Sequence, residues 1–194
     1  MDTLFYKVVR PIVKILFYIL FRPTVIGKEN IPDSGALVLA GNHTKWLDPV
    51  FLVAVSKRQV HFLAKEELFH GITKFIVNGM GCISVNRKIH DKDALNNAKV
   101  GLNKKCCIGV FPEGTINRTK DIIMPFKIGA VKMSSDTGSF LVPFVITGKY
   151  KLFRKGIKIE FLQRRKISGD LEAENKKLML DISRKLEVAK GEER

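Results

Sequence analysis

The segment that decides the fold is NHTKWLDP, residues 42–49. It follows the apolar run Ala36–Ala40, which ends in Gly and Asn and is typical of a buried strand. Pro49 then opens the apolar run Val50–Val55, and Asp followed by Pro is the usual start of a helix. A polar segment between a buried strand and a helix is where α/β proteins usually carry their sites.

The rest of the chain alternates in the same way. The pattern predicts a single α/β domain with a mostly parallel or mixed central sheet flanked by helices. A chain of 194 residues can bury about 70% of its unfolded surface, so it needs no metal or disulfide to hold a core. Further strands are expected near Val60–Lys65, Cys82–Asn86, Cys106–Phe111 and Leu141–Ile146, a hairpin or edge strand within Lys149–Arg165, and helices near Leu68–Asn78, Asp91–Asn103, Gly129–Thr137 and Asp170–Lys190.

The composition is that of a basic globular protein. Lys and Arg number 34 against 19 Asp and Glu, a net charge of +15, and 45% hydrophobic residues exclude disorder and collagen-like repeats. The charge fits a nucleic acid, an anionic membrane or a phosphorylated substrate, or it serves solubility alone. The 13 Phe residues lack the interleaving with basic residues that nucleic-acid binding uses, so no nucleic-acid partner is expected. Three cysteines without paired spacing indicate a reducing compartment and no thiol chemistry.

The N-terminal residues 1–26 form a predicted membrane-association segment. Leu4–Phe21 is apolar except for Lys7, Arg10 and Lys14, which fall within about 60° of one another around a helix. Its longest uninterrupted apolar run has seven residues, too short for a span of about 20, and no signal-peptide cleavage site follows it. The pattern favours a helix lying in a membrane interface, with Phe17 and Phe21 among the lipid-facing residues. The alternative is a helix packed on the protein's own core.

His43 and Asp48 are the candidate catalytic pair. If the loop between them folds back, Asp48 accepts the Nδ1 proton of His43 and leaves Nε2 free as a general base. The alternatives are that Asp48 only caps the following helix and that His43 is only solvated. No GxSxG nucleophile motif is present, so the base is expected to activate a hydroxyl of a bound substrate.

A second loop follows the strand that ends at Phe111. It carries Glu113 and Gly114, and it should emerge at the same edge of a parallel sheet. Cations at neighbouring strand ends suit a phosphate monoester, although each could be an ordinary solvated cation. These cations are Arg87, Arg118, Lys120 and Lys127. His43, Asp48 and Glu113 match no closed metal-ligand set, so no metal is expected.

Four segments, taken together, resemble the motifs of the 1-acyl-glycerol-3-phosphate acyltransferase family. His43–Asp48 is similar to the NHxSxxD motif, with Lys45 where Ser is common. Gly81–Arg87 resembles a second motif, Phe111–Thr115 is FPEGT letter for letter, and Val142-Pro143-Phe144 resembles a fourth. One departure is Ile116, at a place where many members have Arg; here Arg118 follows two positions later.

The resemblance implies acyl transfer from a coenzyme A or acyl-carrier-protein thioester to lysophosphatidic acid, giving phosphatidic acid, with no cofactor. The catalytic domain would be residues 27–194, with His43 as base and Asp48 as its orienting partner. It implies a peripheral protein on the cytoplasmic face of the membrane. The alternatives are a lysophospholipid acyltransferase with another acceptor and a noncatalytic module that binds polyanions or anionic lipid. Acceptor binding falls to Arg87, Glu113 and Gly114, with Lys45, Thr115, Arg118 and Lys127 around them, and the acyl side to Val142, Pro143 and Phe144.

Overall fold

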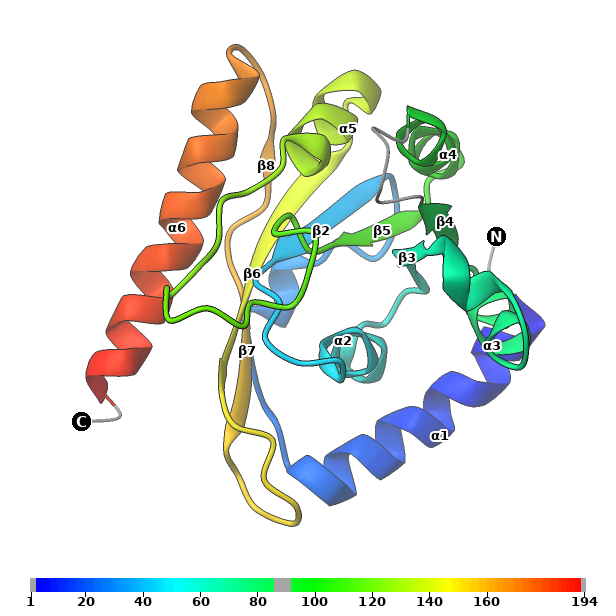
Figure 1. The fold of residues 1–194 in the computed structure, drawn as a ribbon, viewed down its shortest axis with the longest axis vertical. Coiled ribbons are helices and arrows are strands. Elements are labelled where there is room, and N and C mark those ends of the chain that lie inside the picture. Colours follow the sequence, from blue (N-terminus) through cyan, green and yellow to red (C-terminus); the bar gives the residue numbers. More distant parts are fainter. Residues whose placement is uncertain (1–2, 86–91, 193–194) are drawn as a thin grey trace.

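A mixed β-sheet forms the centre of the molecule. The computed structural model describes residues 3–85 and 92–192, and within these ranges it contains an eight-stranded sheet in the order β1-β7-β6-β2-β5-β3-β4, with β8 pairing with β6 (Figure 1). The strands are β1 (Thr24–Ile26), β2 (Leu37–Gly41), β3 (Val60–Lys65), β4 (Ile83–Val85), β5 (Cys107–Val110), β6 (Phe140–Gly148), β7 (Ile157–Phe161) and β8 (Arg165–Lys166).

Six helices surround the sheet in the described part of the chain. They are α1 (Leu4–Phe21), α2 (Asp48–Val55), α3 (Thr73–Gly79), α4 (Lys92–Asn103), α5 (Gly129–Thr137) and α6 (Leu171–Glu192), with 3-10 turns η1 (Lys28–Asn30) and η2 (Glu66–Phe69). Figure 1 shows α4, α5 and α6 on one side of the sheet, and α1 and α2 on the other. The predicted α/β fold with a mixed sheet between helices is confirmed.

Strand direction brings the loops of interest to one edge. β2 lies at the centre and runs parallel to both β5 and β6, so the carboxyl ends of all three strands meet there. β7 runs antiparallel to β6, as expected for a hairpin, and makes the sheet mixed. The residues after Gly41, Val110 and Gly148 are therefore neighbours.

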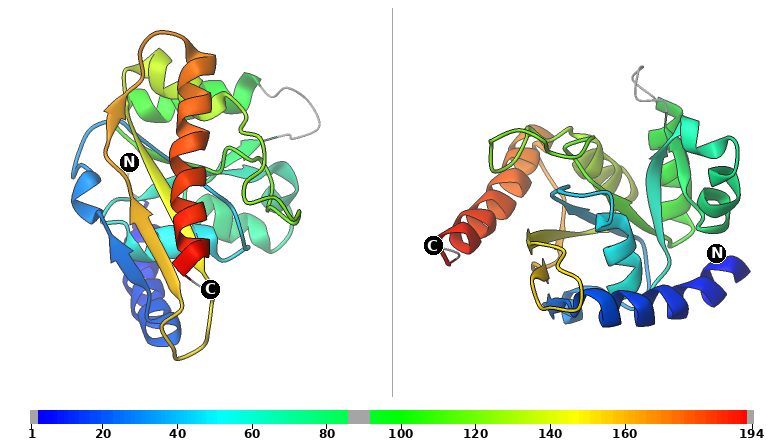
Figure 2. Two further views of the ribbon diagram at one scale, coloured as in Figure 1. Left: turned by 90° about the vertical axis from the view of Figure 1, so that its left-hand side faces the viewer. Right: turned by 60° about the horizontal axis from the view of Figure 1, so that its bottom comes forward.

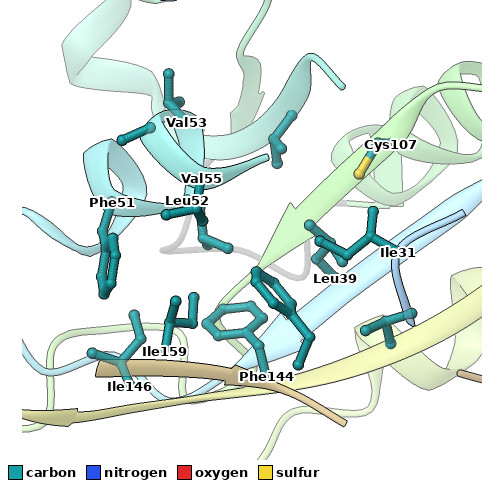
Figure 3. Close-up of a cluster of buried hydrophobic side chains, with 14 of the residues drawn as sticks. Ile31, Leu39, Phe51, Leu52, Val53, Val55, Cys107, Phe144, Ile146 and Ile159 are labelled. Carbon is teal, nitrogen blue, oxygen red and sulfur yellow. The ribbon is translucent and has the colours of Figure 1, made fainter. Parts of the chain in front are cut away.

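Alternation along the strands separates two cores. Leu37 and Leu39 of β2 face the α1–α2 side, where they pack with Phe51 and Leu52, while Val38 and Ala40 face α4, α5 and α6. Figure 3 shows part of the first core. Because both faces are covered, β2 is apolar along almost its whole length, as buried parallel strands are.

The helix predicted over Leu68–Asn78 is wrong in extent. The chain forms η2 and then α3, with Gly71 between them at a φ of +62°. A left-handed residue interrupts a right-handed helix, and the Thr73 hydroxyl then donates to the carbonyl oxygens of Leu68 and His70.

Helix α1 has one buried face and one exposed face. Thr3 caps its start by accepting the N–H of Tyr6, and Arg22 ends it in the left-handed conformation. Tyr6, Phe17 and Phe21 are buried against the core, so the placement of Phe17 and Phe21 among lipid-facing residues is wrong. The right-hand view of Figure 2 shows α1 in blue along one side of the molecule. None of the helices in the described ranges is long and apolar enough to cross a membrane.

Candidate active site

His43 and Asp48 meet at the carboxyl edge of the sheet. His43 Nδ1 lies 2.9 Å from Asp48 Oδ2, and the carboxylate is completely buried while the imidazole is 13% exposed. Because several N–H and O–H groups converge on this carboxylate, it acts as an acceptor and His43 must donate from Nδ1. Nε2 then carries the free lone pair, which is the state required of a general base.

The loop folds back because Asp48 binds its backbone. Oδ2 accepts the N–H groups of Thr44 at 2.6 Å and Lys45 at 2.8 Å. Asp48 is the first residue of α2, and its carboxylate accepts from the preceding loop, with no side-chain cap at the start of the helix. The alternative in which Asp48 only caps the helix is therefore wrong.

Tyr150 is a site residue that the sequence interpretation missed. Its hydroxyl donates to Asp48 Oδ1 at 2.6 Å. Burial, and next to it the charge of Asp48 and the bond to it, raise the pKa of Tyr150, so the phenol keeps its proton and donates. The available signal was its position two residues after β6, a strand parallel to the one that leads to His43.

Glu113 braces the loop that carries His43. Its Oε1 accepts the backbone N–H of His43 at 2.8 Å, and its Oε2 accepts that of Met124 at 2.9 Å. The side chain is buried, and burial raises the pKa of Glu113 in spite of these two hydrogen bonds. Both oxygens thus have backbone partners, whereas the sequence led us to expect that Glu113 binds the acceptor.

The imidazole of His43 stacks on an aromatic ring, and hydrogen bonds hold the backbone on either side of it. The His43 ring stacks on Phe111 with centroids 4.1 Å apart and planes 20° apart. Asn42 exchanges two hydrogen bonds with the backbone of Ile146, which ties the end of β2 to β6. Asn117 donates its N–H to the His43 carbonyl oxygen, so the loop after FPEGT also lies beside His43.

The predicted acceptor-binding residues differ in exposure, and one of them lies outside the described residues. Gly114, at a φ of +74°, lies directly under Lys127, whose Cε would be 3.0 Å from a Cβ at that position. The side chains of Lys45, Thr115, Arg118 and Lys127 are exposed. Arg87 lies outside the described residues.

The predicted acyl-side residues belong to the core. Val142, Pro143 and Phe144 are buried in β6. Phe144 packs edge-on against Phe111 with centroids 5.8 Å apart, and so reaches the imidazole only through that ring.

The cysteines and the possible metal ligands are the other reactive groups of the described residues. Cys107 is buried, which raises its pKa to about 12, while Cys82 and Cys106 are half-buried. Within residues 3–85 and 92–192, no group of three His, Cys, Asp or Glu side chains is placed to hold a metal ion.

Residues 22–147 match the model of the family described as Acyltransferase. The chain belongs to this family. The family match of this acyltransferase covers β1 to β6 and includes His43, Asp48 and Glu113, but it ends three residues before Tyr150. The family predicted from the four motifs is confirmed.

Individual relatives agree with this assignment. The 1-acyl-sn-glycerol-3-phosphate acyltransferase of Borreliella burgdorferi is 32% identical over 136 residues, which cover 69% of this acyltransferase and 54% of that protein. The enzyme of the same name from Bacillus subtilis is 30% identical over 157 residues, covering 78% and 77%. The chain thus matches about half the length of the first relative and about three quarters of the second.

The fold also has a solved counterpart. The crystal structure of PlsC, a 1-acyl-sn-glycerophosphate (LPA) acyltransferase from Thermotoga maritima, superposes with a TM-score of 0.78. The two chains are 21% identical, and the match covers 95% of this acyltransferase and 79% of PlsC. The likeness in fold thus extends over almost the whole chain.

Proposed function

We propose that this acyltransferase moves a fatty acyl group from a thioester to the sn-2 hydroxyl of 1-acyl-glycerol 3-phosphate and forms phosphatidic acid. The observation that carries the proposal is the His43–Asp48 pair with Nδ1–H donated and Nε2 free. The names of the Borreliella and Bacillus relatives support the choice of acceptor.

In the proposed reaction His43 Nε2 removes the proton of the acceptor hydroxyl. The oxygen attacks the thioester carbonyl carbon, the C–S bond breaks, and the thiolate takes the proton back from the imidazolium. Asp48 holds the imidazole in one tautomer and stabilises its charged form. A thioester is already activated, so alignment and charge stabilisation supply the rest, and the proposal requires no cofactor.

The donor is either acyl-CoA or acyl-carrier protein. The first presents phosphates and the second an acidic surface, and both suit a chain with a net charge of +15. The acceptor phosphate would be bound by exposed cations around the base, for which Lys127 beside Gly114 is the best-placed described candidate.

The protein is proposed to work on the cytoplasmic face of a membrane without crossing it. Six large apolar side chains of α1 are more than half exposed: Leu4, Val8, Ile12, Ile15, Leu16 and Ile19. Phe5 packs edge-on against Phe75, which brings α3 beside α1, and on α3 the side chains of Phe75 and Ile76 are also exposed. An exposed apolar surface of this extent suits a lipid interface.

A thiol-release assay with both donors tests the proposal. Each donor is offered with lysophosphatidic acid, lysophosphatidylcholine and glycerol 3-phosphate in separate reactions. We expect the fastest turnover with lysophosphatidic acid. Preference for another lysophospholipid would indicate remodelling, and binding of anionic lipid without thiol release would indicate a noncatalytic module.

A further inference from the structure

Among the described residues, the phenol of Tyr150 makes the only short hydrogen bond to Oδ1 of Asp48. Asp48 Oδ2 has three short partners, which are His43 Nδ1 and the N–H groups of Thr44 and Lys45. Oδ1 has one short partner, the Tyr150 hydroxyl at 2.6 Å, besides a long contact of 3.3 Å from Thr44 Oγ1. The orientation of the carboxylate about its own axis therefore depends on Tyr150.

We propose that Tyr150 is a positioning residue for the general base, and that helix α1 holds Tyr150 in place. This inference rests on the proposed function, because it concerns the efficiency of the same base. Tyr150 acts through Asp48: it fixes the carboxylate, which fixes the ring of His43 and thus the direction of the Nε2 lone pair.

The contacts of the Tyr150 ring lead to α1. Its centroid lies 5.5 Å from that of Phe21 and 6.2 Å from that of Phe17, both edge-on, and 6.3 Å from that of Phe51 on α2. Edge-to-face pairs at these distances add stability beyond burial alone. The segment after β6 is also tied to the helix, because the N–H of Phe153 donates to the carbonyl of Leu20. The end of α1 is thus joined both to the ring of Tyr150 and to the segment that carries it.

Substitution of the hydroxyl alone tests the first half of the inference. Tyr150→Phe keeps the ring contacts and removes the donor to Asp48. We expect kcat to fall by about 10-fold or more, as for a lost hydrogen bond to a charged group, with KM for both substrates nearly unchanged. The matched control is Tyr6→Phe, since the hydroxyl of buried Tyr6 donates to the carbonyl of Arg58 at 3.1 Å, away from the base. The control should lose similar stability but retain kcat.

A second pair of variants tests the role of the helix. Phe21→Leu keeps an apolar side chain but removes the edge-on partner of Tyr150, and we expect a several-fold lower kcat. Phe5→Leu is the control on the same helix, because Phe5 packs with Phe75 instead. Vesicle binding is measured for both variants, so that a change in kcat is not confused with a change in membrane attachment.

A proton NMR resonance of the Nδ1–H of His43 gives a readout independent of turnover. Tyr150→Phe should shift or broaden it, and Tyr6→Phe should leave it in place. A kcat of Tyr150→Phe within twofold of that of Tyr6→Phe, or an unchanged resonance, would overturn the inference. If the wild-type protein releases no thiol, the proposed function fails, and the resonance still decides whether Tyr150 orients the pair.

Discussion

At the scale of single residues, one buried carboxylate organises the site. Asp48 accepts hydrogen bonds from a ring nitrogen, two backbone N–H groups and a phenol, so its charge is fully compensated although water does not reach it. The loop, the helix start and the imidazole are all placed by the same two oxygen atoms. Any change at position 48 is therefore expected to affect folding and catalysis together.

Substitution of His43 separates the effect on catalysis from the effect on folding. His43→Ala should lower turnover by at least about 100-fold, the usual scale for removal of a general base. The fold should persist, because the bonds from position 43 to Glu113 and Asn117 use the backbone. Thiol release and circular dichroism measure the two effects. A folded variant with nearly normal turnover would exclude His43 as the base.

Substitution of Glu113 distinguishes a structural role of this side chain from a role in substrate binding. Glu113→Gln places an amide NH₂ against one of two backbone N–H donors, so we expect the free energy of unfolding to fall by about 1–3 kcal/mol. Urea denaturation measures this loss. An unchanged stability combined with a raised KM for the acceptor alone would instead support a direct contact with substrate.

The phenol of Tyr150 gives stability a dependence on alkaline pH. Its pKa is raised in the folded state, mainly by burial, above the ordinary value of 10.0. Above about pH 10 the unfolded chain loses this proton while the folded chain keeps it, so the free energy of unfolding falls as pH rises. Tyr150→Phe should show a shallower fall in denaturation experiments at alkaline pH. Equal slopes for the two proteins would contradict the raised pKa.

At the scale of elements, α1 divides its side chains between two environments. Ile12, Ile15 and Ile19 are exposed, so their combined change to Ser should weaken vesicle binding more than about tenfold while thermal stability changes little. The same change at Val100 and Val188, which are equally exposed on α4 and α6, is the control. Co-sedimentation with anionic vesicles measures binding. Equal effects of both sets would disprove a specific membrane face.

Some elements were predictable from the sequence, and the shortest were not. Helix α5 and strand β3 have the bounds expected, and Gly138 in the left-handed conformation ends α5. β1 has only three residues and no internal pattern, and it exists because β7 pairs with it. Likewise, the meeting of His43 and Asp48 followed from their spacing, whereas Tyr150 joins them only through the parallel pairing of β2 and β6. Side-chain partners set by tertiary contacts leave no local signal.

At the scale of the whole molecule, the sheet gathers the site from distant parts of the sequence. His43, Glu113 and Tyr150 follow three different strands, and β2 at the centre pairs with the other two. Each loop then binds the next: Glu113 binds the backbone of His43, and Tyr150 binds Asp48. Each of these loops is thus held by a hydrogen bond from another loop, which favours one fixed geometry of the site.

The pairing of β1 with β7 also determines when the burial of α1 can be completed. Thr24 is opposite Lys158, so roughly 130 residues must be synthesised before this contact exists. At about 5–20 residues per second, that delay is on the order of 10 s. Tyr150, which packs on Phe17 and Phe21, is absent during this interval, so α2 alone is available to cover that face of α1. If α1 binds lipid as proposed, a nearby membrane would compete with the protein's own core for this helix on the ribosome, and we predict that a chain arrested before Ile157 stays attached to lipid.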